Sequence, residues 1–100
     1  MKTFDEVHQL ALEGLWLSFP RLKYENITLR SNLKKDFRLD SLDHVDFLCA
    51  VEELYGATII DKDLYENSEK DFQEAASKTF ADIIRCLQFY INKIEGEQNV

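Results

Sequence analysis

The chain has 100 residues, 45% of them hydrophobic, which is enough for one core but leaves little room for a second. We therefore expect a single domain over residues 1–100. The 12 Lys and Arg residues against 19 Asp and Glu give a net charge of −7, which would repel nucleic acid and anionic lipid and attract basic protein surfaces. No segment has the apolar run of a signal peptide or a membrane span. The sequence predicts a cytoplasmic chain with protein partners, no nucleic-acid binding and no membrane insertion.

The first helix is predicted over roughly residues 4–18. Thr3 and Glu6 have the spacing of a capping box, in which each side chain accepts a hydrogen bond from the other residue's backbone N–H. Apolar residues then recur every three or four positions until Pro20, which cannot continue a helix. They are Phe4, Val7, Leu10, Ala11 and Leu15.

Residues 19–40 lack helical periodicity, and loops of that length are usually functional. We expect a long loop between the first and second helices, held to the core by scattered apolar residues. These are Ile27, Leu29, Leu33, Phe37 and Leu39.

Three further helices are predicted in the remainder of the chain. Periodicity returns over 41–55 and stops at Gly56, which adopts the left-handed conformation at a helix end cheaply. Ser68–Asp71 and Thr79–Asp82 repeat the capping-box spacing, and a strong apolar stripe follows the second of them. The fold class is therefore all-α, a bundle of three to four helices, with a flexible tail over about 95–100.

The helix over 41–55 has two contrasting faces. Phe47, Leu48, Val51, Leu54 and Tyr55 are expected to face the core. The opposite face has acids mixed with apolar residues and no Lys or Arg, a composition typical of a docking surface, although a merely solvated face is the alternative. It consists of Leu42, Asp43, Asp46, Cys49, Ala50 and Glu53.

The start of this helix carries the most specific motif. Asp40-Ser41-Leu42-Asp43, at the end of a long loop and the start of a helix, resembles the attachment motif of acyl carrier proteins. The segments around Ile27-Thr28 and Leu33 upstream, and Ile59-Ile60-Asp61 and 79–84 downstream, resemble the same family in the same order. The resemblance covers most of residues 27–94 and implies an acyl-carrier-like bundle.

The resemblance implies a function as well as a fold. In this family a phosphopantetheinyl transferase, or holo-carrier synthase, joins 4'-phosphopantetheine to a serine, here Ser41, and the thiol of the arm holds acyl groups as thioesters. The carrier itself is not an enzyme, and we expect a monomer. Its partners would be enzymes of fatty-acid, polyketide or related biosynthesis with basic docking patches, such as ketosynthases and acyltransferases. The positions matching the family's recognition surface are Asp40, Leu42, Asp43, Asp46, Cys49 and Glu53.

Two departures from the family pattern suggest a specialised carrier. The family commonly has glycine in the turn before the serine, whereas residues 36–40 contain none, and Arg38 places a positive charge there. The segment between Asp61 and Thr79 is also longer than the corresponding segment of typical members. We expect an additional or extended helix over Ser68 to Lys78.

Other functions remain open at this point. An unmodified helical adaptor with the same fold is the main alternative, and a peptidyl carrier is disfavoured because the Gly-Gly pair usual before its serine is missing. A hydrolase using Ser41 with His44 lacks the Gly-x-Ser-x-Gly elbow, and His44 is expected to be an exposed helix residue. Two His and two Cys residues dispersed along the chain predict no metal site.

Overall fold

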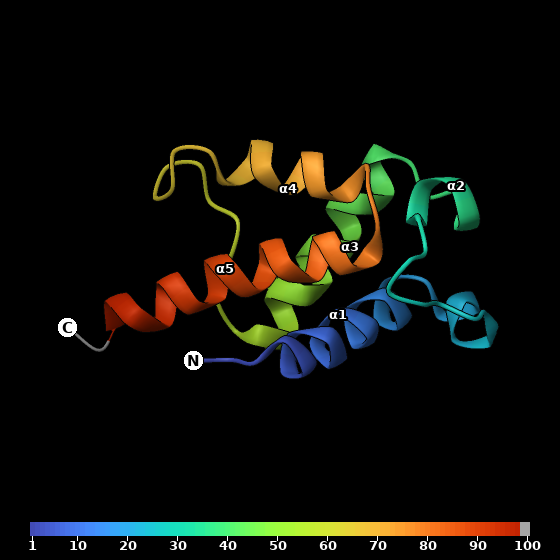
Figure 1. The fold of residues 1–100 in the computed structure, drawn as a ribbon, viewed down its shortest axis with the longest axis horizontal. Helices are drawn as coiled ribbons and strands as arrows, with labels where there is room; N and C mark the ends of the chain where they lie inside the picture. Colours follow the sequence, from blue (N-terminus) through green and yellow to red (C-terminus); the bar gives the residue numbers. More distant parts are fainter. Residues whose placement is uncertain (99–100) are drawn as a thin grey trace.

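The computed structural model describes residues 1–98, which form a helical bundle without strands (Figure 1). The all-α prediction is thus confirmed for this part of the chain. Its elements are α1 (Phe4–Ser18), the 3₁₀ helix η1 (Pro20–Tyr24), α2 (Leu33–Phe37), α3 (Ser41–Tyr55), α4 (Ser68–Ala76) and α5 (Phe80–Gln98).

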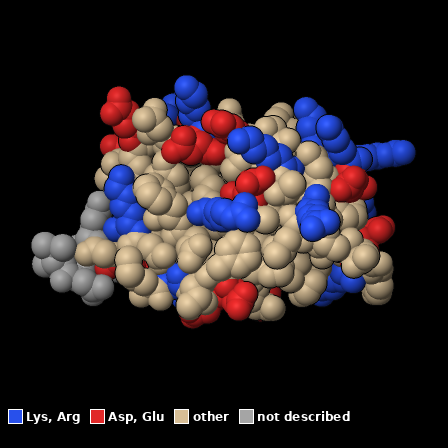
Figure 2. Space-filling view, viewed as in Figure 1, with Lys and Arg blue, Asp and Glu red and all other residues tan. Residues whose placement is uncertain are grey.

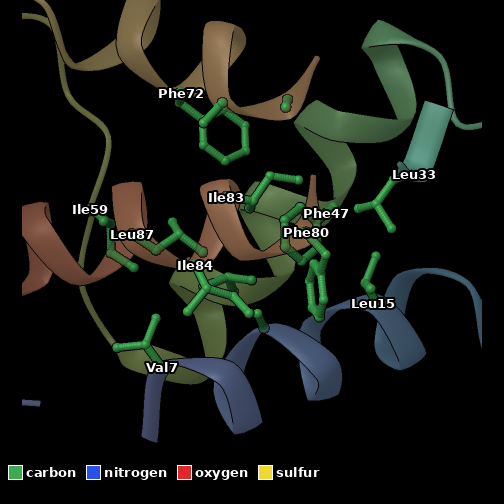
Figure 3. Packing of buried hydrophobic residues seen from close by; sticks show 14 of the residues in the cluster. Val7, Leu15, Leu33, Phe47, Ile59, Phe72, Phe80, Ile83, Ile84 and Leu87 are labelled. Carbon is green, nitrogen blue, oxygen red and sulfur yellow. The ribbon is translucent and has the colours of Figure 1, made fainter. Parts of the chain in front are cut away.

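The core lies between α1, α3 and α5, with α4 packed on α5. Side chains from these elements point toward one another in Figure 3 and are fully buried, among them Leu15, Phe47 and Ile84. α1 packs closely on α3, since Gly14 of α1 lies directly against Val51 of α3. Burying apolar side chains contributes roughly 1.5–3 kcal/mol each, so this shared core is what aligns the helices.

Local capping signals set most of the helix boundaries. The predicted bounds of the first two long helices agree with α1 and α3, and Thr3 and Glu6 form the expected capping box. Thr79 and Asp82 exchange the same hydrogen bonds at the start of α5. The capping role predicted for Ser68 is wrong, because Asn67 is the N-cap and the fully buried Ser68 hydroxyl makes no hydrogen bond within the described residues.

The connection over residues 19–40 is more structured than the sequence predicts. It contains η1, which begins at Pro20, and α2, which Asn32 caps by accepting the Lys35 N–H at 2.9 Å. Of the residues expected to hold this connection, Leu33 and Leu39 are fully buried. The backbone carbonyls of Leu29 and Ser31 also accept N–H groups from the first turn of α5. The connection is therefore tied to the core at several points.

The segment from Ser68 to Lys78 includes α4, as expected, and helps to close the bundle. Phe72 stacks on Phe47 of α3 with ring centroids 6.5 Å apart, and the Tyr90 hydroxyl donates to Asp71 at 2.6 Å. At the other end of the chain, α5 continues as far as Gln98, although a tail is predicted from residue 95. Residues 99–100 of that tail lie outside the described residues.

Candidate functional site

Ser41 is the first residue of α3 and is exposed. Within residues 1–98 its hydroxyl makes no hydrogen bond, and the backbone N–H groups of Ser41 and Leu42 have no acceptor. The first N–H groups of a helix point outward and carry the positive end of its dipole. The chain thus displays a free hydroxyl beside donors that favour a negatively charged group.

Asp40 and Asp43 cap α3 reciprocally. The Asp43 N–H donates to the Asp40 carboxylate at 2.9 Å, and the Asp40 N–H donates to the Asp43 carboxylate at 3.0 Å. The sequence places both residues on the recognition surface and does not identify this cap. The signal was nevertheless present, because an acid followed three residues later by another acid is a variant of the capping-box pattern.

The turn before Ser41 is fixed from both sides. Leu39 is fully buried, and its N–H donates to the Leu33 carbonyl at 3.2 Å. Arg38 ends α2 in the left-handed conformation, with φ 60° and ψ 34°. That conformation disfavours residues with a Cβ atom, so glycine would suit this position and its absence leaves a strained arginine in the turn.

The exposed face of α3 includes most of the expected recognition residues. Leu42, Asp46, Cys49 and Glu53 are all exposed and follow one another at helical spacing, and Leu42 is 74% exposed. Val45, 55% exposed, belongs to the same surface but was not identified from the sequence. We call these five residues the α3 face.

Two assignments on the wheel of α3 are wrong. Ala50 was expected on the outer face but is only 6% exposed, because it lies on the side of α3 that turns toward the other helices. Leu54 was expected in the core but is 44% exposed, since the bundle no longer covers this side near the end of α3.

The acidic side chains of α3 differ in whether they form hydrogen bonds within the protein. Glu52 accepts the backbone N–H groups of Ile59 and Ile60 and so holds the loop that follows the helix. Asp46 and Glu53, by contrast, make no side-chain hydrogen bond or ion pair in the part of the chain that the structure describes. Their charges are therefore available to a partner.

His44 is buried, which corrects the expectation of an exposed helix residue. Only 8% of it is accessible, and neither ring nitrogen has a hydrogen-bond partner among the described residues. Burial lowers the pKa of the imidazole, and the nearby Asp43 and Asp40 carboxylates only partly oppose this effect. Because His44 makes no hydrogen bond to Ser41, the geometry of a nucleophile and its base is missing.

Other kinds of site find no support in the described residues. No helix among residues 1–98 combines the length and the apolar character needed to cross a bilayer. Nor do three or more His, Cys, Asp or Glu side chains in this range gather in a way that could hold a metal ion.

Comparison with known proteins finds a curated relative of this chain. A curated acyl carrier protein from Coprothermobacter proteolyticus is 43% identical to this chain over 64 residues. The match covers 64% of this chain and 66% of that relative, just under two thirds of its length. No protein-family model matches the chain, and no solved structure matches it significantly. Together with the all-helical fold, the similarity to the curated relative supports assigning this chain to the acyl carrier protein family.

Proposed function

We propose that this chain is an acyl carrier protein whose Ser41 carries a covalent 4'-phosphopantetheine arm. The observation that carries the proposal is the exposed Ser41 hydroxyl at the first position of the 15-residue helix α3, within a motif similar to the family's attachment site. The similarity to a curated acyl carrier protein supports the same assignment. A carrier, and not a catalyst, is the role that this similarity implies.

The surroundings of Ser41 fit the phosphate of such an arm. The unpaired N–H groups of Ser41 and Leu42 and the positive end of the α3 dipole favour a phosphodiester on the hydroxyl. During attachment the Ser41 oxygen would form a bond to the phosphorus of the phosphopantetheine half of coenzyme A. The pyrophosphate bond to that phosphorus would break, and adenosine 3',5'-bisphosphate would leave. A transferase would remove the hydroxyl proton, since His44 is not hydrogen-bonded to the serine.

The chain's own residues would present the arm without taking part in chemistry. The Asp40–Asp43 cap and the buried Leu39 fix the start of α3, so Ser41 stays exposed in one place. When bound, the arm supplies a thiol that holds acyl groups as thioesters. The α3 face, with unpaired Asp46 and Glu53 beside exposed apolar side chains, suits basic patches on partner enzymes.

The cellular role follows from the family. We infer a cytoplasmic carrier in fatty-acid, polyketide or related biosynthesis. It would be loaded by a phosphopantetheinyl transferase and used by acyl-processing enzymes such as ketosynthases and acyltransferases.

Intact mass after co-expression with a broad-specificity phosphopantetheinyl transferase tests the proposal. The wild-type chain should gain the mass of one arm, and Ser41→Ala should gain none while keeping its circular dichroism spectrum. Ser77→Ala is the matched control, because Ser77 is also exposed but donates its hydroxyl to the Glu74 carbonyl. An unmodified wild-type chain would favour the adaptor function, and a modified Ser41→Ala variant would place the arm elsewhere.

A further inference from the structure

Positive charge is concentrated in one part of this acidic chain. Residues 21–38 contain six of the 12 Lys and Arg residues but only two of the 19 acids. The six are Arg21, Lys23, Arg30, Lys34, Lys35 and Arg38. We call them the basic end. The net charge of −7 does not reveal this basic segment, because acids far outnumber Lys and Arg in the rest of the chain.

The positive charges of the basic end are not neutralised by acids among the described residues. Each residue is exposed, and within residues 1–98 none forms an ion pair with a carboxylate. Figure 2 shows several Lys and Arg side chains gathered at the end of the molecule where Figure 1 places α2. Cations without local partners contribute little to folding, so their concentration here calls for a different explanation.

The scaffold beneath the basic end is ordered. Leu22 of η1 and Leu33 of α2 are fully buried, and the Arg21 guanidinium donates to the Phe37 carbonyl at 3.3 Å. The segment between them is tied to α5 by the Leu29 and Ser31 carbonyls. Charges held on a packed scaffold keep a defined arrangement, which a specific interface requires.

The basic end adjoins the attachment site. Arg38 precedes Ser41 by three residues, so an enzyme that reaches the Ser41 hydroxyl must also approach α2 and its C-terminal turn. Tyr24, at the end of η1, is 91% exposed beside these cations. Tyr and Arg are the residue types enriched at the energetic centres of protein interfaces.

We propose that the basic end is a second docking surface, which meets an acidic patch on the same enzymes that contact the α3 face. The inference rests on the proposed function, because it takes Ser41 as the point that these enzymes must reach. The docking site on the partner enzyme would then have two parts. A basic part would contact the α3 face and an acidic part would contact the basic end, with the opening that admits the phosphopantetheine arm between them. Such a pair of contacts would fix the orientation of the carrier as well as attract it.

The charge pattern favours a protein over a lipid or nucleic-acid partner. Asp36 lies between Lys35 and Arg38 in the sequence, and Asp40 follows Arg38 by two residues; both would be repelled by a uniformly negative bilayer or phosphate backbone. A protein surface can place acids opposite the cations and bases opposite the acids. The mixed pattern around Ser41 therefore matches a protein whose charges also change sign across its surface.

The experiment measures kcat/KM for modification of Ser41 by the phosphopantetheinyl transferase of the source organism, with coenzyme A as the donor. It compares this value between the wild-type chain and two charge-reversal variants. Lys34→Glu/Lys35→Glu should lower kcat/KM roughly tenfold, mainly through KM, and the loss should shrink as salt rises. Lys62→Glu/Lys70→Glu is the control, since it changes charge equally on exposed residues near the start of α4 and breaks only the exposed ion pair of Lys62 with Glu69 at 3.9 Å. The control should stay within about twofold of the wild type.

Several outcomes would overturn the inference. If the wild-type chain is modified at Ser41 and the Lys34→Glu/Lys35→Glu variant reacts as fast or faster, the basic end is not a docking surface although the proposed function stands. If the wild-type chain is not modified at all, both fail together. Binding of the wild-type chain to phosphatidylserine vesicles, lost in the same variant, would assign the basic end to lipid instead.

Discussion

Asp40 and Asp43 hold each other's backbone N–H groups across the first turn of α3, at 2.9 and 3.0 Å. Two acids that the sequence assigns to partner recognition thus also stabilise the helix that presents Ser41. A substitution at either residue will change the helix start as well as the surface charge. Asp46, which makes no side-chain hydrogen bond within residues 1–98, separates the two effects.

Removing the cap should lower stability by a measurable amount. We expect Asp40→Ala and Asp43→Ala each to lower the free energy of unfolding by about 1 kcal/mol, as loss of an N-cap does. The double variant should lose less than the sum, because the two hydrogen bonds belong to one motif. Urea denaturation measures these differences. Asp46→Ala serves as the control, and an equal loss for Asp46→Ala and Asp40→Ala would show that the cap is not the cause.

Charge on the α3 face should control the rate of modification without affecting the fold. Asp46→Lys should lower kcat/KM for attachment of the arm, since a basic patch on the transferase would then meet a like charge. The effect should weaken with added salt, because exposed charges are screened over about 8 Å at physiological ionic strength. Glu66→Lys makes the same charge change on an exposed loop residue. Equal rates for both variants, each with unchanged circular dichroism, would contradict docking through the α3 face.

The sequence could predict helices wherever local signals were sufficient. Thr3, Pro20 and Gly56 mark helix boundaries through their own backbone and side-chain chemistry, so α1 and the end of α3 were predictable. α2 was not predicted, because a helix of five residues is unstable alone and depends on burial of Leu33 and Leu39 against the rest of the bundle. Its existence is a tertiary effect.

The candidate site shows the same division. The local motif predicts Ser41 at the start of a helix, and Ser41 is the first residue of α3 in the structure. Burial of His44 and Ala50 depends on where α1 and the other helices pack around α3, which an isolated helical wheel does not specify. The left-handed Arg38 was equally beyond prediction, since arginine gives no preference for that conformation.

Burial of His44 should make the fold sensitive to acid. Its pKa lies below the ordinary 6.5 because burial disfavours the charged ring, with Lys34 acting in the same direction and Asp43 and Asp40 opposing it. The unfolded chain therefore binds a proton more readily than the folded chain. The contribution of His44 to stability is fully present above pH 6.5 and is lost progressively as pH falls below that value.

Urea denaturation at pH 7.5 and pH 5.5 measures this effect. The wild-type chain should lose stability at the lower pH, and His44→Leu should lose distinctly less, because leucine cannot bind a proton. His8→Gln is the control, since it removes the other histidine while leaving His44 in place. A loss in His44→Leu as large as that in the wild type would assign the acid sensitivity to other groups.

Close packing of α1 on α3 should make Gly14 intolerant of a side chain. Alanine in a helix interior is normally favoured over glycine by about 1 kcal/mol. A Cβ atom at Gly14, however, would lie 2.5 Å from Cγ2 of Val51, with the Val51 backbone N at 3.4 Å. Valine has few alternative rotamers in a helix, so the two helices would have to separate, at a cost of roughly 1–3 kcal/mol. We therefore expect Gly14→Ala to lower the melting temperature.

The Val51→Ala variant serves as a second background for the same substitution, because it removes the methyl group that the new Cβ would meet. In that background Gly14→Ala should be nearly neutral or stabilising, and a double-mutant cycle gives the difference as a coupling free energy. Stabilisation by Gly14→Ala in the wild-type background would mean that α1 and α3 lie farther apart than the Gly14–Val51 contact indicates.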